Sequence, residues 1–320
     1  MTEVATLARG VLAADRRSVA RAITLVESRH AEDEERALEL LGALARQHRR
    51  GLRVGVSGPP GVGKSSLLEA LGTSLIGLGW KPFVLVVDPS SRRAGGSILG
   101  DKTRMTELAR SPRAFVRPSP SGEAAGGISS AAGDVLLIAE AAGFGPILVE
   151  TVGVGQAELA VLEVVDLLLL LLEPGAGDEL QGIKRGLNEW ADVVAVTKAD
   201  AGRAELARHS SAEFAAAFQL LRGRDAPRVM AVSAHEGRGV DELWRALEER
   251  HRALLESGEL EHRRAEQRKT ELSRRLARAL LRRFTLEPGR AAALARAEEQ
   301  VSSGALLAAE AVRQLLDGKG

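Results

Sequence analysis

The chain contains no cysteine, which excludes disulfides, cysteine nucleophiles and thiolate metal sites together. It also has almost no net charge: 44 Lys and Arg against 43 Asp and Glu give a formal charge of +1, so overall charge gives no reason to expect nucleic-acid or membrane binding. The most hydrophobic run, Leu167–Leu172, is far shorter than the ~20 residues that a membrane-spanning helix needs. We therefore interpret this run as a buried strand of a parallel sheet.

The residues that are present describe a globular protein. Hydrophobic residues make up 45% of the 320 residues and charged residues 27%, which is enough to bury a large core beneath a polar surface. The first residues lack the basic region followed by an apolar run that marks a secretion signal. We expect a cytoplasmic protein.

The segment from residue 52 to 68, LRVGVSGPPGVGKSSLL, is the most informative part of the sequence. It reads as a short apolar strand, a glycine-rich loop and the start of a helix, which is the context that a phosphate-binding loop requires. Glycines let backbone N–H groups turn toward an anion, and the helix start adds further N–H groups. Lys64 would reach the β- and γ-phosphates, and the Ser65 hydroxyl would bind Mg²⁺. We predict that the nucleotide is bound here by Gly58, Pro59, Pro60, Gly61, Val62, Gly63, Lys64, Ser65 and Ser66.

After Gly51, short apolar runs alternate with helical segments. Because the runs are apolar almost throughout, the pattern predicts an α/β fold of the P-loop NTPase type, with a mostly parallel sheet covered by helices on both faces. Ligands in such folds bind at the carboxyl ends of the strands. The expected strands are Leu52–Val56, Phe83–Val87, Ala114–Val116, Ile147–Val149, Leu167–Leu172, Val193–Val196 and Val229–Val232.

The choice between ATP and GTP rests on residues 197–200, TKAD, at the end of an expected strand. In an (N/T)-K-x-D box the carboxylate, here Asp200, accepts hydrogen bonds from the ring N–H and the exocyclic amine of guanine. Adenine would leave this carboxylate unpaired, at a cost of a few kcal/mol. Thr197 replaces the usual asparagine and is too short for the same contact to the base, so we expect reduced affinity. The predicted guanine-binding residues are Thr197, Lys198, Asp200, Ser233 and Ala234.

Carboxylates near the ends of other strands are candidate ligands for Mg²⁺, which prefers oxygen ligands and keeps several waters. The predicted metal site consists of Ser65, Asp88, Asp101 and Glu150. Gly153 is expected to present its N–H to the γ-phosphate, which would make the following loop sensitive to hydrolysis. Val154 stands where Ras-like enzymes carry a water-orienting glutamine, so we expect slow intrinsic turnover that a partner accelerates.

Four segments together resemble the MeaB/ArgK/MMAA family of GTPases, which are chaperones of the cobalamin-dependent methylmalonyl-CoA mutase. The segments are GPPGVGKSS, VDPSSRRAGGSILGDKTRM, ETVGVGQAE and GAGDELQGIKRG, and the resemblance extends from about residue 15 to residue 255. It implies a GTPase domain, residues 51–255, between a helical N-terminal extension, residues 1–50, and a helical C-terminal arm, residues 256–320, that forms a homodimer. The helical spacing of apolar residues at both ends of the chain fits this division.

The resemblance also implies roles for individual residues. Lys64 and Ser65 would bind phosphate and Mg²⁺, and Asp88, Asp101 and Glu150 would surround the metal. Residues 175–186 would form an additional switch, with Lys184 reaching the nucleotide when the partner is bound. The predicted catalytic residues are Lys64, Lys184 and Glu150. The family couples GTP hydrolysis to adenosylcobalamin loading and to rescue of the inactivated mutase, which makes a cobalamin adenosyltransferase a further candidate partner.

Two alternative functions remain open. One is an ATP-using kinase of transport proteins, a role once attached to members of this family, although the chain lacks the kinase signature set. The other is a GTPase for nickel insertion, as in related GTPases that serve hydrogenase and urease. The histidines of the present chain are scattered rather than clustered, which argues against a nickel site. They are His30, His48, His209, His235, His251 and His262.

The segment from residue 261 to 283 is rich in Lys and Arg, interleaved with leucines at helical spacing. It has almost no aromatic residues on which bases could stack, and no recognised nucleic-acid module accompanies it. We interpret it as the solvated face of a helix that packs by its apolar stripe.

Overall fold

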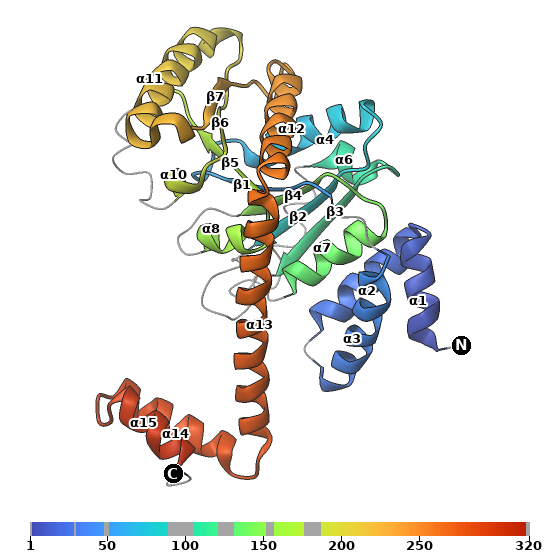
Figure 1. Cartoon of the computed structure of the whole chain (residues 1–320), viewed down its shortest axis with the longest axis vertical. Helices are drawn as coiled ribbons and strands as arrows, with labels where there is room; N and C mark the ends of the chain where they lie inside the picture. Colours follow the sequence, from blue (N-terminus) through green and yellow to red (C-terminus); the bar gives the residue numbers. More distant parts are fainter. Residues whose placement is uncertain are drawn as a thin grey trace. The chain divides into compact units, whose positions relative to one another are not determined.

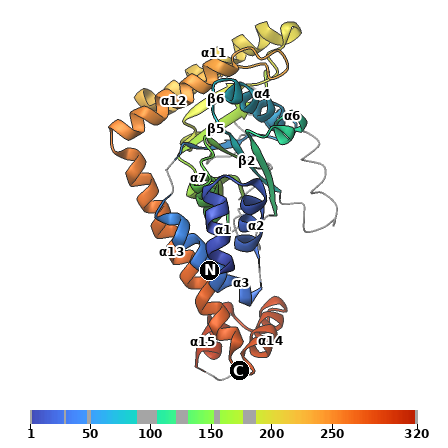
Figure 2. The same ribbon diagram turned by 90° about the vertical axis from the view of Figure 1, so that its right-hand side faces the viewer.

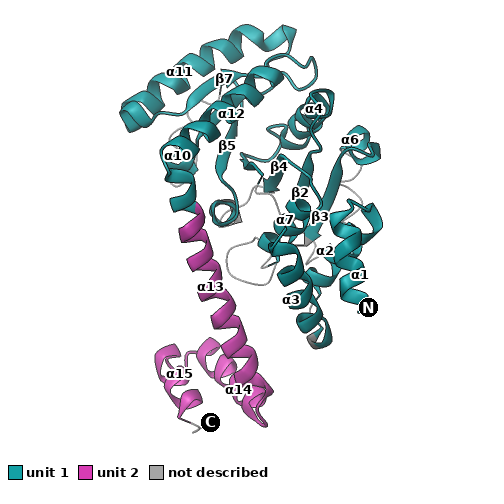
Figure 3. Ribbon diagram, turned by 45° about the vertical axis from the view of Figure 1, so that its right-hand side comes forward, with its two compact units in different colours: residues 1–263 teal, residues 264–320 magenta. Residues whose placement is uncertain are grey.

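The computed structural model describes residues 2–28, 30–47, 51–88, 105–120, 131–151, 157–175 and 187–317. Two compact units are present, residues 1–263 and residues 264–320 (Figure 3). The candidate nucleotide-binding residues that the structure describes all belong to the first unit.

A seven-stranded sheet forms the centre of the first unit, and all of its described strands pair in parallel in the order β3-β2-β4-β1-β5-β6-β7 (Figure 1). This confirms the predicted fold class. The strands are β1 (Arg53–Ser57), β2 (Phe83–Asp88), β3 (Phe115–Pro120), β4 (Ile147–Thr151), β5 (Leu167–Leu172), β6 (Val193–Val196) and β7 (Arg228–Ala231). β3 extends four residues beyond its expected end, because it pairs with β2 along its full length.

The register of the sheet brings the ends of its central strands together. Val56 of β1 lies opposite Glu150 of β4, and Ser57 lies opposite Leu170 of β5. Leu172 of β5 in turn lies opposite Val196 of β6. The loop after β1, the carboxylate of β4 and the segment after β6 therefore emerge at the same edge of the sheet, where ligands of open α/β folds bind.

Helices cover both faces of the sheet, and β5 shows why its leucine run is required. Its six leucines are all buried, and successive side chains point to opposite faces. Leu167, Leu169 and Leu171 share a hydrophobic cluster with α4 (Lys64–Gly77) and α12 (Val240–Glu256). Leu168 contacts the cluster that contains α7 (Ala132–Ala141), and Leu170 and Leu172 pack with α11 (Ala204–Arg222).

The remaining short helices of the first unit connect these layers. They are α6 (Thr106–Arg110), α8 (Ala157–Ala160), α10 (Leu187–Trp190) and the 3-10 turns η2 (Val161–Glu163), η3 (Ala201–Arg203) and η4 (Gly223–Asp225).

Three N-terminal helices pack against α7 and share one hydrophobic cluster with the sheet (Figure 2). They are α1 (Glu3–Leu12), α2 (Arg16–Glu27) and α3 (Ala31–Ala45). Polar contacts fix α2 along the edge strand β3: Arg16 donates to the carbonyl of Ala114, and Glu27 accepts from Arg117 and Ser119. The edge strand is thereby covered, which hinders pairing with another chain. The division of the chain into three domains stays a prediction.

The C-terminal part of the chain is helical, as expected. α13 (Glu259–Leu286) begins in the first unit and ends in the second, where α14 (Arg290–Ser302) and α15 (Ala308–Leu316) follow. α14 and α15 bury small side chains, namely Ala293, Ala297 and Ala311. Arg290 stacks over the Phe284 ring at 4.9 Å from its centroid. Among the described helices, none has both the length and the apolar character required to cross a membrane.

A buried ion pair fixes the strand that leads into the phosphate-binding loop. Arg53 of β1 donates from Nε and Nη2 to the two carboxylate oxygens of Glu140 on α7, at 2.9 and 2.8 Å. The Glu140 side chain is fully buried and that of Arg53 is 17% exposed. This two-bond geometry is the strongest form of an arginine–carboxylate contact.

We predict that Glu140→Ala lowers the free energy of unfolding by roughly 3 kcal/mol, because it leaves a largely buried guanidinium without its carboxylate. Urea denaturation measures this loss. The control is Glu249→Gln, which removes an ion pair with Arg228 that is exposed on both sides and should change stability by about 1 kcal/mol or less. Equal losses in the two variants would show that the buried pair contributes nothing special.

Candidate nucleotide-binding site

The phosphate-binding loop joins β1 to α4, and its glycines are required by geometry at two points. At Gly58 a Cβ would lie 2.6 Å from the carbonyl oxygen of Leu171, so no larger residue fits against β5. Gly63 has φ of 98° in the left-handed region and precedes α4 without a side-chain cap. The first turn of α4 therefore presents its backbone N–H groups toward the loop, as anion sites at helix starts do.

Lys64 spans this loop. Its Nζ donates to the carbonyl oxygens of Gly58 at 2.8 Å and Pro59 at 3.0 Å, and the residue is buried. A phosphate anion attracts an ammonium more strongly than a carbonyl dipole does, so a nucleotide entering the loop would compete for the same donor. Pro60 is exposed at the turn of the loop.

The hydroxyl of Ser65 and the carboxylate of Glu150 converge beside the loop. Ser65 Oγ donates to Glu150 Oε1 at 2.9 Å, and Glu150 is buried at 4% exposure near the end of β4. These are hard oxygen donors of the kind that Mg²⁺ prefers, so the pair fits a magnesium site completed by phosphate oxygens and water. Within the described residues no group of three or more His, Cys, Asp or Glu is placed to hold a metal ion.

Several predicted site residues lie outside the part of the chain that the structure describes. These are Asp101, Gly153 and Lys184, together with the side chain of Asp88, whose backbone ends β2. Their proposed roles around the metal and the γ-phosphate stay predictions.

A cavity of about 260 Å³ separates the phosphate-binding loop from the segment after β6. It is the place where the structure brings together most of the predicted nucleotide-binding residues. Its lining includes Gly61, Val62, Gly63 and Ser66 on one side, and Thr197, Lys198, Asp200, Ala234 and His235 on the other.

Thr197 links the two sides of this cavity. Its Oγ1 lies 2.6 Å from the carbonyl oxygen of Val62 and 3.2 Å from that of Leu172, and the residue is buried. The hydroxyl thus ties the segment after β6 to the phosphate-binding loop and to β5. The short side chain that we expected to weaken base binding serves here to hold the two walls of the cavity together.

Asp200 is held by a neighbouring loop. Its Oδ1 accepts a hydrogen bond from Ser233 Oγ at 2.5 Å, and Ser233 Oγ also accepts from the N–H of Glu236 at 3.0 Å. Ser233 is one of the predicted guanine-binding residues, and in the structure its side chain fixes the carboxylate. A carboxylate fixed in this way can accept the two N–H donors of guanine without first being ordered.

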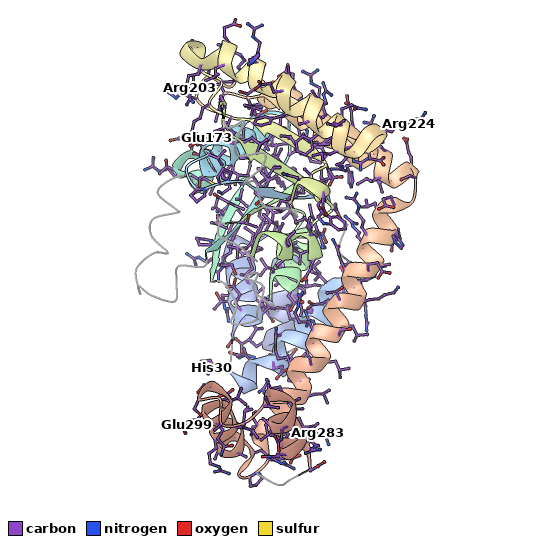
Figure 4. The ribbon with its side chains drawn as sticks, turned by 90° about the vertical axis from the view of Figure 1, so that its left-hand side faces the viewer. His30, Glu173, Arg203, Arg224, Arg283 and Glu299 are labelled. Atoms are coloured by element: carbon purple, nitrogen blue, oxygen red, sulfur yellow. The ribbon has the colours of Figure 1, made fainter. Side chains whose placement is uncertain are left out.

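Two residues of this region were not anticipated from the sequence. Glu173, at the carboxyl end of β5 (Figure 4), forms an ion pair with Lys198 at 2.6 Å. His235 lines the cavity next to Ala234. A signal for Glu173 was present, because it is the first charged residue after six consecutive leucines and so marks a strand end. No motif pointed to His235.

The comparisons with known proteins agree with the site. A family model described as "Methylmalonyl Co-A mutase-associated GTPase MeaB" matches residues 19–288. A probable GTPase of Mycobacterium tuberculosis (strain H37Rv) is 45% identical over 314 residues, which cover 97% of this chain and 94% of that protein. The mouse protein named methylmalonic aciduria type A homolog, mitochondrial, is 42% identical over 320 residues, covering 96% of this chain and 77% of that protein.

One further relative and one solved structure are also similar to the chain. GTPase ArgK of Escherichia coli is 45% identical over 276 residues, covering 83% of this chain and 82% of that protein. The crystal structure of a protein named LAO/AO transport system kinase has a TM-score of 0.74 and 34% identity, and the match covers 99% of this chain and 98% of that one. The resemblance inferred from the four sequence segments is confirmed.

We predict that Thr197→Val lowers the affinity for GDP by about tenfold, because the carbonyl of Val62 loses the Thr197 hydroxyl, a donor worth about 1 kcal/mol or more. Thr197→Ser keeps the hydroxyl and is the matched control, with affinity close to that of the unmodified protein. Isothermal titration with GDP distinguishes the two. If the valine and serine variants bind equally well, the hydroxyl does not hold the cavity together.

Proposed function

Because the chain belongs to the MeaB family of methylmalonyl-CoA mutase-associated GTPases, we propose that it is a Mg²⁺-dependent GTPase chaperone of methylmalonyl-CoA mutase or a related acyl-CoA mutase. In this proposal GTP hydrolysis is coupled to adenosylcobalamin loading and to protection of the mutase in the cytoplasm, with a cobalamin adenosyltransferase as a further partner. The observation that carries the nucleotide part is the cavity lined by both the phosphate-binding loop and Asp200.

In this proposal each predicted site residue has a separate role in hydrolysis. Asp200 would accept the N–H donors of the base, and Lys64 would stabilise the negative charge on the β- and γ-phosphates as water displaces GDP from the γ-phosphorus. Ser65 and Glu150 would hold Mg²⁺, which supplies further neutralisation of phosphate charge. Lys184, as the third proposed catalytic residue, would complete the site when the partner is bound.

A homodimer formed through the C-terminal helices is also part of the proposal. α13 exposes leucines at helical spacing, each with more than half of its surface accessible to solvent. An exposed apolar stripe of this kind commonly marks a protein–protein interface. The exposed leucines are Leu272, Leu276, Leu280, Leu281 and Leu286.

Neither alternative function gains support from the site. An ATP-using kinase would leave Asp200, which Ser233 holds toward the base cavity, without a donor from the adenine ring. Nickel insertion would require a metal-binding cluster, and the described residues contain none built from His, Cys, Asp or Glu.

We predict that the protein binds GDP with micromolar affinity and ADP far more weakly. We also predict that Lys64→Ala lowers the GDP affinity by about 100-fold or more, because this variant loses a charge-assisted contact to phosphate. Lys269→Ala, which removes an exposed lysine of α13, is the control and should bind as the unmodified protein does. Equal affinities for GDP and ADP would overturn the guanine assignment.

The client is tested with purified methylmalonyl-CoA mutase. We predict that the mutase increases the rate of GTP hydrolysis, that adenosylcobalamin loading proceeds with GTP and stalls with a non-hydrolysable analogue, and that Lys184→Ala keeps GDP affinity while losing the stimulation. Phosphate release and the cobalamin absorbance spectrum report the two steps. The mutase would be excluded as the client if it did not stimulate GTP hydrolysis and also did not co-elute with the protein in the presence of GDP or of the analogue.

A further inference from the structure

We propose that Glu173 is a positioning residue for guanine selection: its carboxylate holds the Lys198 ammonium so that it does not occupy Asp200, the acceptor that guanine needs. This inference rests on the proposed function and deepens it, because it concerns how the same cavity selects its base. It assigns a role to an ion pair that none of the sequence motifs includes.

The geometry of the pair is well defined. Lys198 Nζ lies 2.6 Å from Glu173 Oε1, and the two side chains are 34% and 31% exposed. The backbone of Lys198 has φ of 55°, in the left-handed region that residues with a Cβ rarely adopt. Such a conformation persists only where the surrounding structure enforces it. Here the residues on either side of Lys198 are both anchored, since the N–H of Thr197 donates to Leu172 and that of Ala199 donates to Val232.

Glu173 is also held on a fixed piece of backbone. The residue before it, Leu172, accepts bonds from both the N–H and the hydroxyl of Thr197. Two residues later, the N–H of Gly175 donates to the buried Ser210 at 2.9 Å. Because the carboxylate is presented from an anchored segment, less freedom is lost when the ion pair forms than in a typical surface pair.

The ion pair affects base binding because Lys198 lies close to Asp200. Lys198 and Asp200 are two residues apart and line the same cavity, and they carry opposite charges. Ser233 already donates to one oxygen of Asp200. A flexible lysine that also paired with this carboxylate would use the remaining acceptor capacity that the ring N–H and exocyclic amine of guanine require. Glu173 provides a competing carboxylate that keeps Lys198 along the wall of the cavity.

The test is a double-mutant cycle between Glu173→Gln, which keeps the shape of the side chain, and Lys198→Met, which keeps the apolar stem. We expect Glu173→Gln to lower GDP affinity by about fivefold in the native background, and by less than about twofold when Lys198 is already methionine. The affinities are measured by titration calorimetry, with Glu249→Gln as a control that removes a fully separate, exposed ion pair.

Inosine diphosphate (IDP) lacks the exocyclic amine of guanine. The ratio of the GDP affinity to the IDP affinity therefore reports how well Asp200 accepts that amine, and a purely structural role of Glu173 would leave this ratio unchanged. The GDP:IDP affinity ratio should fall in Glu173→Gln and return toward the native value in Glu173→Asp. The melting temperature of both variants should stay within a few degrees of the native value. Equal losses in both Lys198 backgrounds, or an unchanged GDP:IDP ratio, would overturn the inference. Failure of the unmodified protein to bind GDP would instead overturn the proposed function.

Discussion

The hydroxyl of Thr197 is the contact on which the organisation of the site depends. It joins the phosphate-binding loop, through Val62, to the end of β5, through Leu172. The sheet register places β1, β5 and β6 side by side, but the loops that follow these strands could still diverge beyond the strand ends. The buried hydroxyl opposes this, since breaking the contact would remove the hydrogen bond that the Val62 carbonyl accepts from Thr197, while Leu172 would keep its bond from the Thr197 N–H. The residues predicted to bind the phosphates and those predicted to bind the base thus line one cavity and are joined across it.

Around that cavity, charged residues are arranged so that each key group has a partner before any ligand arrives. Lys64 is held by carbonyls of its own loop, Asp200 by Ser233, and Lys198 by Glu173. Because these partners already orient the groups, less conformational freedom is lost when a nucleotide binds. The ion pair between Arg53 and Glu140 acts at the start of β1, where it fixes the strand that leads into the phosphate-binding loop.

The fold could be predicted from the sequence because its signals are local and strong. The leucine run of β5 and the glycine pattern after β1 each specify a structure within a few residues, and a parallel sheet then fixes where their ends meet. The contacts that cross between loops could not be predicted in this way. The side chains of Thr197, Ser233 and Glu173 act on partners far along the chain, and their residue types fit many surface positions equally well. Only the tertiary arrangement identifies their roles.

Together these contacts lead us to propose that the cavity holds a guanine nucleotide with its base against Asp200. A crystal structure of the protein bound to GDP tests it most directly. We expect the diphosphate in the loop before α4 and the Asp200 carboxylate within hydrogen-bonding distance, about 3 Å, of both the ring nitrogen and the exocyclic amine of guanine. An empty cavity, or a bound base with the Asp200 side chain turned away from it, would show that this cavity is not a guanine site.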